Sequence, residues 1–278
     1  MTAVPGSDAA PEDDFLSGTS GMVIGTRALA RALARDAWAD GVDRLAGRPW
    51  RLRRAAASGP TRRLLALSVQ RVGEPNLLGP ISAELARSRH AVHLDSVGVE
   101  GLGKFQNLNR LLTRNPLDGY DWLLVVDDDV RLPRGFLDVF VFLIERFGLR
   151  IAQPAHRARS HAAWQVTRRR AGSLVRETRY VEIGPVVAFH RTTFDALLPF
   201  PELRMGWGLD AYWGAVARER GWPVGIVDAT AIHHGLRRIG ASYDIGEAIA
   251  ESRRFLHDRP HLTAAEAQRT LVTHRSLS

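Results

Sequence analysis

The chain alternates short apolar runs with segments of helical pattern. The most apolar short run, WLLVV at residues 122–126, lies between polar residues. Large and β-branched apolar residues in so short a run predict a strand that is buried on both faces. Similar runs predict further strands at residues 64–69, 91–94, 150–152 and 224–228, and a strand bent at Gly184-Pro185 over residues 180–190.

Helical patterns separate most of these strands. They cover residues 26–45, 77–88, 105–112, 135–146, 191–198 and 209–220. Strands that alternate with helices predict parallel βαβ units with right-handed crossovers. The first half of the chain therefore predicts an α/β sheet of the nucleotide-binding type.

The pattern also divides the chain into regions. Residues 1–20 are rich in Pro, Gly, Ser and acids, which predicts disorder. Residues 21–63 form a helical basic extension, in which the arginine-rich residues 48–63 are interpreted as a linker in preference to a surface for acidic lipid or nucleic acid. The catalytic unit is expected at residues 64–240, with a mobile or ligand-covering segment at 156–179. Residues 241–278 are expected to be a C-terminal helical extension.

Composition and charge limit the kinds of site and partner that this chain can have. The 278 residues contain no cysteine, which excludes disulfides, zinc-thiolate sites and a thiol nucleophile and favours a reducing compartment. The net charge of +8 favours anionic partners. No apolar run is long enough to span a bilayer, and the acidic N-terminus differs from a secretory signal. We expect a cytoplasmic protein, with peripheral contact to the inner membrane face through the basic N-terminal segment as an open alternative.

Three consecutive acids follow the strand at residues 122–126. Open α/β sheets place ligands at this end of their strands. Asp127, Asp128 and Asp129 repel one another unless cations or donors neutralise them, and a divalent metal does so. In an extended segment Asp127 and Asp129 would face one ion and Asp128 would point elsewhere. Oxygen ligands suit Mg²⁺ or Mn²⁺ bound to a substrate diphosphate. The alternative is a solvated acidic turn that caps the next helix.

A second motif, GVEGLGKF at residues 98–105, nearly satisfies the Walker pattern of phosphate-binding loops. The position after the lysine should be Ser or Thr to bind Mg²⁺, but it is Phe105. A P-loop phosphotransferase is therefore the minority interpretation.

Five segments in order carry a stronger resemblance. They are the polar loop after the first strand, Asp95 after the second, GLGKFQNLN, the strand ending in DDD, and the late segments GWGLDAYW and IVDATAIHH. With these segments, residues 64–240 resemble the GT-A class of nucleotide-sugar glycosyltransferases, in particular an inverting type with a DXD motif. The resemblance implies a Rossmann-like mixed central sheet flanked by helices, in a single catalytic domain.

The resemblance also implies roles for single residues. Asp127 and Asp129 would bind the metal that bridges the donor diphosphate, and His233 or His234 would be a late metal ligand. Asp210 would be the general base, although the usual Glu-Asp pair is Leu209-Asp210 here. Residues near the nucleotide would be Gln70, Arg71, Asp95, Lys104, Asn107 and Asp128, the last of these near the ribose.

The chemistry of sugar transfer agrees with this arrangement. A departing diphosphate needs a cation, and a hydroxyl acceptor needs one carboxylate on the opposite side of the sugar. Asp210 can also be a helix cap, and Glu182 is either a second acid on the acceptor side or a buried charge paired beside Arg179. Trp207 and Trp213 can stack on a sugar or pack in the core.

The sequence thus predicts a metal-dependent glycosyltransferase with a nucleotide-diphospho-sugar donor and an unidentified hydroxyl acceptor. A P-loop phosphotransferase and a non-catalytic, basic nucleic-acid-binding protein are the alternatives, and no nucleic acid is expected as a partner of the transferase.

Overall fold

A mixed β-sheet forms the centre of the molecule. The computed structural model describes residues 23, 25–237 and 244–277. Along the sheet the strands lie in the order β2 (Ala91–Gly98), β1 (Arg63–Gln70), β3 (Trp122–Val126), β7 (Val186–His190), β5 (Ile151–His156), β8 (Val224–His234), β6 (Val175–Thr178) and β9 (Thr270–His274). The short strand β4 (Val130–Arg131) pairs with the end of β8.

Both strand orientations occur in this sheet. Strand β1 is parallel to β2 and β3, and β5 is parallel to β8. Strand β7 runs antiparallel to its neighbours β3 and β5, and β6 runs antiparallel to β8 and β9. The predicted mixed sheet flanked by helices is confirmed.

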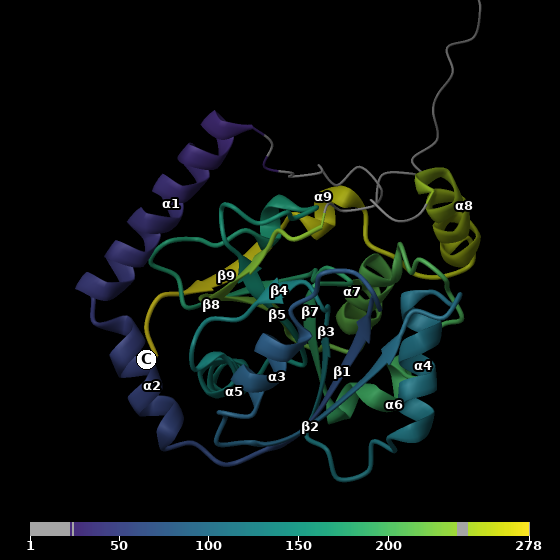
Figure 1. Ribbon diagram of the computed structural model, residues 1–278, viewed down its shortest axis with the longest axis horizontal. Helices are drawn as coiled ribbons and strands as arrows, with labels where there is room; N and C mark the ends of the chain where they lie inside the picture. The colour runs from purple at the N-terminus through teal and green to yellow at the C-terminus, as the bar shows by residue number, and fades with distance from the viewer. Residues whose placement is uncertain (1–22, 24, 238–243, 278) are drawn as a thin grey trace, which may run out of the picture.

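Helices cover both faces of the sheet because the central strands are apolar on both sides. Residues of β1 alternate between two cores: Leu65 and Leu67 face one, Leu64 and Ala66 the other. Figure 1 shows α4 (Lys104–Arg114), α6 (Phe194–Leu197) and α7 (Leu209–Glu219) over the first core. The second core is covered by α2 (Arg48–Ala57), α3 (Leu78–Leu85) and α5 (Phe136–Arg146).

Several boundaries differ from the sequence prediction. Strand β2 continues past Asp95 to Gly98, and β8 is one strand that reaches His234. The predicted linker is helix α2, whose Leu52 and Ala56 are one helical turn apart and buried against the second core. The arginines on its other faces hid this apolar stripe from a reading of composition.

Long-range pairing explains two further differences. The segment expected to be mobile or ligand-covering contains a 3-10 turn, Gln165–Thr167, and strand β6. The C-terminal extension has α8 (Ile245–Leu256) and α9 (Ala264–Ala267), as expected, and also β9, which pairs with β6. The predicted disorder at residues 1–20 and the predicted domain boundary at residue 240 lie outside the described residues.

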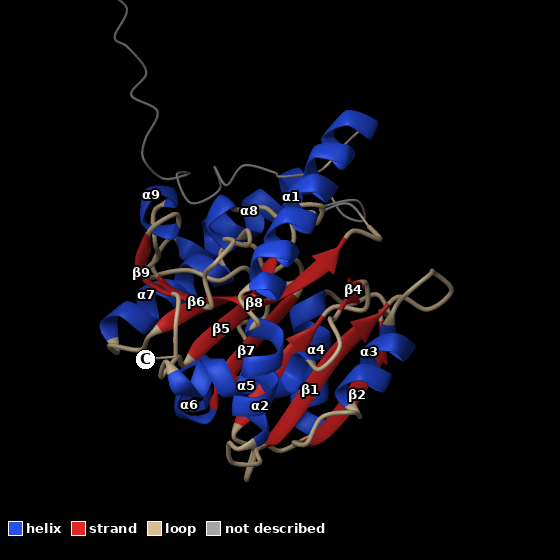
Figure 2. Ribbon diagram, turned by 90° about the vertical axis from the view of Figure 1, so that its left-hand side faces the viewer, coloured by secondary structure: helices blue, strands red, loops and turns tan. Residues whose placement is uncertain are grey.

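Helix α1 (Thr26–Leu45) is attached to the rest of the molecule mainly by charge. Arg169 donates to Asp40 through Nη1 at 2.6 Å and to Asp43 through Nη2 at 2.7 Å. Asp36 accepts from the backbone N–H of Ala158 at 2.8 Å. Figure 1 shows α1 along one edge of the molecule, and Figure 2, viewed from that side, shows it in front of the sheet. Within the described ranges, no helix has the length and apolarity needed to cross a bilayer.

Replacing Arg169 by alanine should therefore loosen α1. The side chain of Arg169 is only 8% exposed, and its loss removes a two-pronged partner from two largely buried carboxylates. We expect the free energy of unfolding to fall by about 2 kcal/mol, between the values typical of exposed and buried pairs. Urea unfolding measures this change, and limited proteolysis should show faster cleavage within α1.

Arg191→Ala is the control, because Arg191 is exposed and its contact with Asp121 spans 3.9 Å. An equal loss of stability in both variants, or unchanged cleavage of α1 in Arg169→Ala, would contradict the proposed attachment.

Candidate active site

The three acids form a turn directly after β3. Asp127 follows the strand, Asp128 and Asp129 lie in the turn, and Val130 starts β4, which pairs with His234 at the end of β8. The extended geometry predicted for this stretch is wrong, because the chain has to change direction to make that pairing. Asp127 and Asp129 consequently have different partners instead of sharing one face of a strand.

Asp127 binds a lysine from the start of α4. Lys104 Nζ lies 2.6 Å from Asp127 Oδ1 and donates to the carbonyl oxygen of Ile183 at 2.9 Å. Gly184 packs against this pair: a Cβ at position 184 would lie 2.6 Å from Asp127 Oδ2 and 2.8 Å from Lys104 Nζ. The acid turn, α4 and the segment before β7 therefore meet at one point, and only glycine fits there.

Asp128 is held by the loop that follows β1. Its Oδ2 accepts from the backbone N–H of Arg71 at 2.9 Å, its Oδ1 binds the Arg237 guanidinium, and only 3% of the residue is exposed. Burial raises the pKa of Asp128, although Arg71 N–H and Arg237 oppose this. Both oxygens of Asp128 already have partners in the protein, and its contact with a ribose stays a prediction. The side chain of Asp127 is 30% exposed and is the accessible one.

Asp129 binds a histidine at the end of β8 and an arginine just beyond it. His234 Nε2 lies 3.2 Å and Arg237 Nε 3.3 Å from Asp129 Oδ2. Burial alone would raise the pKa of Asp129, but His234 and Arg237 outweigh it and the pKa is lowered. For His234, burial has the opposite effect and lowers the pKa, but the contact with Asp129 raises this pKa by more. Asp129 is thus maintained as an anion.

The neighbouring histidine lies elsewhere. Successive residues of a strand point to opposite faces, so His233 does not share the surroundings of His234. Burial and the charges of Arg159 and Arg131 lower the pKa of His233 to about 4. Of the two histidines, His234 is the one that contacts the acid turn. Metal binding by His233 remains a prediction that no contact of this residue supports.

Arg237 is a site residue that the sequence analysis missed. Its guanidinium contacts Asp128, Asp129 and Glu74. An arginine just past a pair of histidines at a strand end was the only local signal, and nothing in the sequence indicates that β8 ends beside the acid turn.

The residues at the turn fit a divalent cation that also binds a substrate. Two ligands at right angles on an octahedral ion, each about 2.1 Å from it, are about 3 Å apart. Asp129 Oδ2 and His234 Nε2 are separated by 3.2 Å. Over the described part of the chain, no group of three or more acidic or histidine residues can bind an ion by itself. The other ligands would have to come from a substrate, as is usual for Mg²⁺.

Asp210 lies at the start of α7, on the other side of the segment 180–184. Tyr180 Oη donates to Asp210 Oδ2 at 2.5 Å, and Asp210 Oδ1 accepts from the N–H of Ala211 at 2.9 Å. Burial raises the pKa of Asp210 to about 6, against the effect of these hydrogen bonds. Tyr180 and Ile183 are three positions apart, or at most about 10 Å of extended chain. The Tyr180 side chain thus links Asp210 to the segment that also contacts Lys104 through Ile183 and Asp127 through Gly184.

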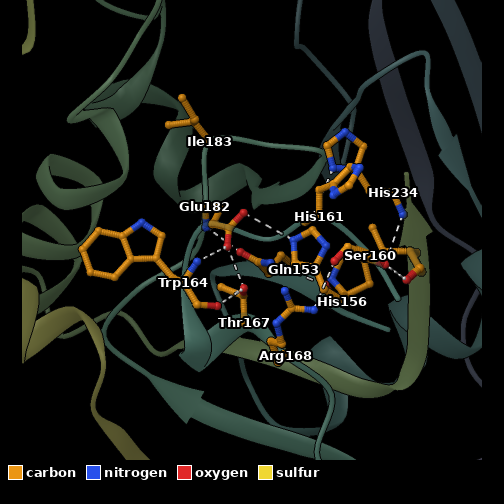
Figure 3. Close-up of polar contacts among 12 residues, drawn as sticks. Gln153, His156, Ser160, His161, Trp164, Thr167, Arg168, Glu182, Ile183 and His234 are labelled. Carbon is orange, nitrogen blue, oxygen red and sulfur yellow. Dashed lines mark hydrogen bonds and ion pairs between the residues drawn. The ribbon is translucent and has the colours of Figure 1, made fainter. Parts of the chain in front are cut away.

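Glu182 lies within that segment but has a structural role. Figure 3 shows it among Gln153, His156, Trp164 and Thr167. It accepts from the Trp164 N–H at 3.1 Å and from Thr167 Oγ1 at 2.6 Å, and His156 Nε2 lies 3.3 Å away. Burial raises the pKa of Glu182, His156 and these donors lower it by more, and the net shift is downward. These contacts support the alternative of a paired buried acid, with His156 as its partner in place of Arg179, and catalysis by Glu182 stays a prediction that no contact supports.

The remaining predicted nucleotide residues divide into two groups. Gln70 and Arg71 lie at the end of β1, beside the acid turn. Asp95 lies within β2 and binds Asn115 and Arg114 at the far end of α4. Asn107 is fully buried and donates to the carbonyl oxygens of Leu102 and Gly103, so no contact in the structure supports its predicted role at the nucleotide. Base binding by Asp95 stays a prediction.

The glycine-rich loop before α4 is not a phosphate cradle. A Cβ on Gly103 would lie 1.8 Å from the carbonyl oxygen of Arg204, and the Gly103 N–H donates to Gln106. Chain packing therefore fills the space that a P-loop gives to a phosphate. A cavity of about 760 Å³ lies at the opposite end of β3, beside Tyr120 and Arg191, and its lining includes neither Asp210 nor the acids of the turn. Trp213 packs in the core against Phe105 and Phe189.

Tyr180→Phe should raise the pKa of Asp210 above about 6, because the lost hydrogen bond stabilises the carboxylate. Carboxyl-carbon NMR over a pH series measures this pKa, and the signal is assigned by its absence in Asp210→Asn. Tyr212→Phe is the control on the same helix, since Tyr212 packs against Phe255. An unchanged or lower pKa in Tyr180→Phe contradicts the coupling.

No protein-family model and no curated protein sequence matches this chain. Among solved structures, it is similar to the mannosyltransferase PcManGT from Pyrobaculum calidifontis, in complex with GDP-Man and Mn²⁺, at 14% identity and TM-score 0.49, covering 86% of this chain and 79% of that one. It is also similar to S. aureus TarS in complex with UDP-GlcNAc, at 11% identity and TM-score 0.49 over 73% and 68% of the two chains. The catalytic domain of Drosophila β1,4-galactosyltransferase 7 gives 17% identity and TM-score 0.47 over 73% and 82%. At these identities the likeness concerns the fold alone.

Proposed function

We propose that this chain is a glycosyltransferase that takes a sugar from a nucleotide-diphospho-sugar and passes it, with inversion, to a hydroxyl acceptor. The observation that supports this is a pair of acids with opposite pKa shifts, Asp129 in the acid turn and Asp210 at the start of α7. Asp129 has a lowered pKa and a histidine at metal-ligand spacing, whereas Asp210 has a pKa raised to about 6. A permanent anion on one side and a proton acceptor on the other is the arrangement that displacement at a sugar carbon requires.

The donor side is the acid turn. Asp129 and His234 would bind Mn²⁺ or Mg²⁺ together with the donor diphosphate. When bound, the ion supplies positive charge against the departing diphosphate. Arg237 lies beside the same carboxylates and adds a guanidinium, which suits phosphate oxygens. Metal binding by Asp127, whose side chain is 30% exposed beside Lys104, stays a prediction, and the loop at Gln70 and Arg71 would contact the nucleoside.

The acceptor side is the start of α7. An acceptor hydroxyl has a pKa far above neutrality, so a carboxylate that removes its proton during attack accelerates transfer. Asp210 is in this state above pH 6 or so, because its raised pKa still leaves it ionised near neutrality. Tyr180 orients the carboxylate because its hydroxyl donates to Oδ2, while Oδ1 accepts from a backbone N–H in the N-terminal turn of α7.

Donor turnover should depend on Asp129 and His234 but not on His233. A panel of UDP- and GDP-sugars is screened for Mn²⁺-dependent release of the nucleotide diphosphate, and the active donor is then tested with the variants. In Asp129→Asn and His234→Ala, Mn²⁺ affinity should fall by at least about 10- to 100-fold, because each loses a direct ligand. His233→Ala is the matched control, since it removes the adjacent imidazole.

Isothermal titration with Mn²⁺ and the nucleotide diphosphate gives the affinity separately from turnover. Equal effects of the two histidine variants would remove the metal assignment. Thermal stabilisation by ATP alone, with no response to any sugar nucleotide, would instead favour a phosphotransferase.

Asp210→Asn should lower the rate of transfer by about 10²- to 10⁴-fold, the usual contribution of a general base, with little change in donor binding. In the unaltered chain the rate should rise with pH through about 6, because Asp210 is protonated and inactive below its raised pKa. This acid limb should be absent in Asp210→Asn. Its persistence there would assign the base to another group.

A further inference from the structure

Helix α1 turns its acidic residues toward the molecule and leaves large apolar side chains exposed. Its acidic residues are Asp36, Asp40 and Asp43, and all of them face the molecule. They pair with Arg157, Arg159 and Arg169 of the segment before β6. Its buried apolar residues are only Ala32 and Ala39. A surface helix normally buries its apolar stripe and turns its charges to water.

The opposite side of α1 carries apolar residues into solvent. Ala30, Ala34, Trp38 and Leu45 follow a spacing that places them on one side of the helix, and all are exposed. Trp38 is 66% exposed and Leu45 93%. Trp50, on α2, is 64% exposed; Figure 1 shows α1 and α2 along one edge of the molecule, and Figure 2, viewed from that side, shows both in front of the sheet. We call Ala30, Ala34, Trp38, Leu45 and Trp50 the outer face.

Only positive charge flanks the outer face. Arg27, Arg31, Arg35 and Arg44 of α1 are exposed and form no ion pair with another described residue. Helix α2 contains no acid, and its Arg54 guanidinium lies 5.5 Å from the centre of the Trp50 ring. Because the acids of α1 form ion pairs on its inner side, the charged residues on the outer side of this helix are all arginines.

We propose that the outer face is a docking surface for an anionic lipid bilayer, on which α1 and α2 lie flat. Tryptophan side chains favour the boundary between headgroups and acyl chains, and arginines beside them attract acidic lipids. A second copy of this chain would bring two rows of arginines together, which disfavours self-association through this face. The proposal is independent of the transferase activity, because no residue of the outer face belongs to the acid turn or to α7.

The ion pairs on the inner side of α1 determine which side of this helix faces solvent. Asp36, Asp40 and Asp43 anchor the helix by ion pairs, so its apolar residues are not needed for packing and remain outside. The outer face is therefore a consequence of how α1 is attached.

Binding of the full chain to vesicles tests this proposal. Sedimentation with vesicles of phosphatidylcholine and phosphatidylglycerol in equal parts should pellet the protein, whereas phosphatidylcholine alone should not. Arg27→Gln/Arg31→Gln should weaken binding by about fivefold per arginine, the contribution of one basic residue near an anionic membrane. Trp38→Ala/Trp50→Ala should weaken it by at least as much. Raised salt should weaken binding of the unaltered chain.

Two control variants match these changes elsewhere on the molecule. Arg87→Gln/Arg191→Gln removes the same net charge from side chains that are 65% and 66% exposed. Leu271→Ala/Val272→Ala removes exposed apolar side chains from β9. Both controls should bind vesicles much as the unaltered chain does.

Three results would overturn the proposal. One is equal binding to neutral and anionic vesicles. Another is a loss of affinity in the controls as large as in the outer-face variants. The third is a dimer in sedimentation velocity that Trp38→Ala/Trp50→Ala converts to a monomer, in a chain that does not bind vesicles; this would make a second copy the partner. Circular dichroism of each variant establishes that it is folded.

Discussion

The repulsion among three adjacent carboxylates is the constraint on which the rest of this structure depends. Two like charges about 4 Å apart repel by about 4 kcal/mol at the effective dielectric of a protein surface. Partners from distant parts of the chain offset this repulsion. Lys104 pairs with Asp127, the Arg71 N–H donates to Asp128, and His234 binds Asp129. Arg237 joins the last two acids. The acid turn therefore holds together the loop after β1, the start of α4 and the end of β8.

A second group of buried charges fixes the segment before β6. Arg176 and Asp228 form a two-pronged pair at 2.8 and 3.0 Å with both side chains fully buried, and Arg176 also donates to the carbonyl of Val166. Glu182 binds the same segment from the other side, through Trp164 and Thr167. Such pairs seldom add much net stability, but breaking one is costly. This segment is thus a packed layer between the sheet and α1.

The sequence predicted those features that depend on local pattern. The strand at residues 122–126, the position of the acids at its end and the helix at Asp210 all follow from short-range periodicity. Features set by distant contacts were missed: the turn at Asp128 and Asp129, the contact of Arg237, and the pairing of β9 with β6. Composition misled at α2, where abundant arginine concealed two buried apolar positions. The amide type of Asn107 suggested a nucleotide contact, which no contact of this buried side chain supports.

The partners of Asp129 and Asp210 explain why the pKa values of these two acids shift in opposite directions. On one side, Asp129 has a cationic group on its oxygen, so burial strengthens that pairing and the acid remains ionised. On the other side, Asp210 is buried with only neutral donors, Tyr180 and a backbone N–H, and its pKa rises to about 6. Burial alone therefore does not decide the protonation of either acid; the charge of its partner does. Residues 180–184 contact Asp210 through Tyr180 and the Asp127–Lys104 pair through Ile183 and Gly184, so this segment connects the start of α7 to the acid turn.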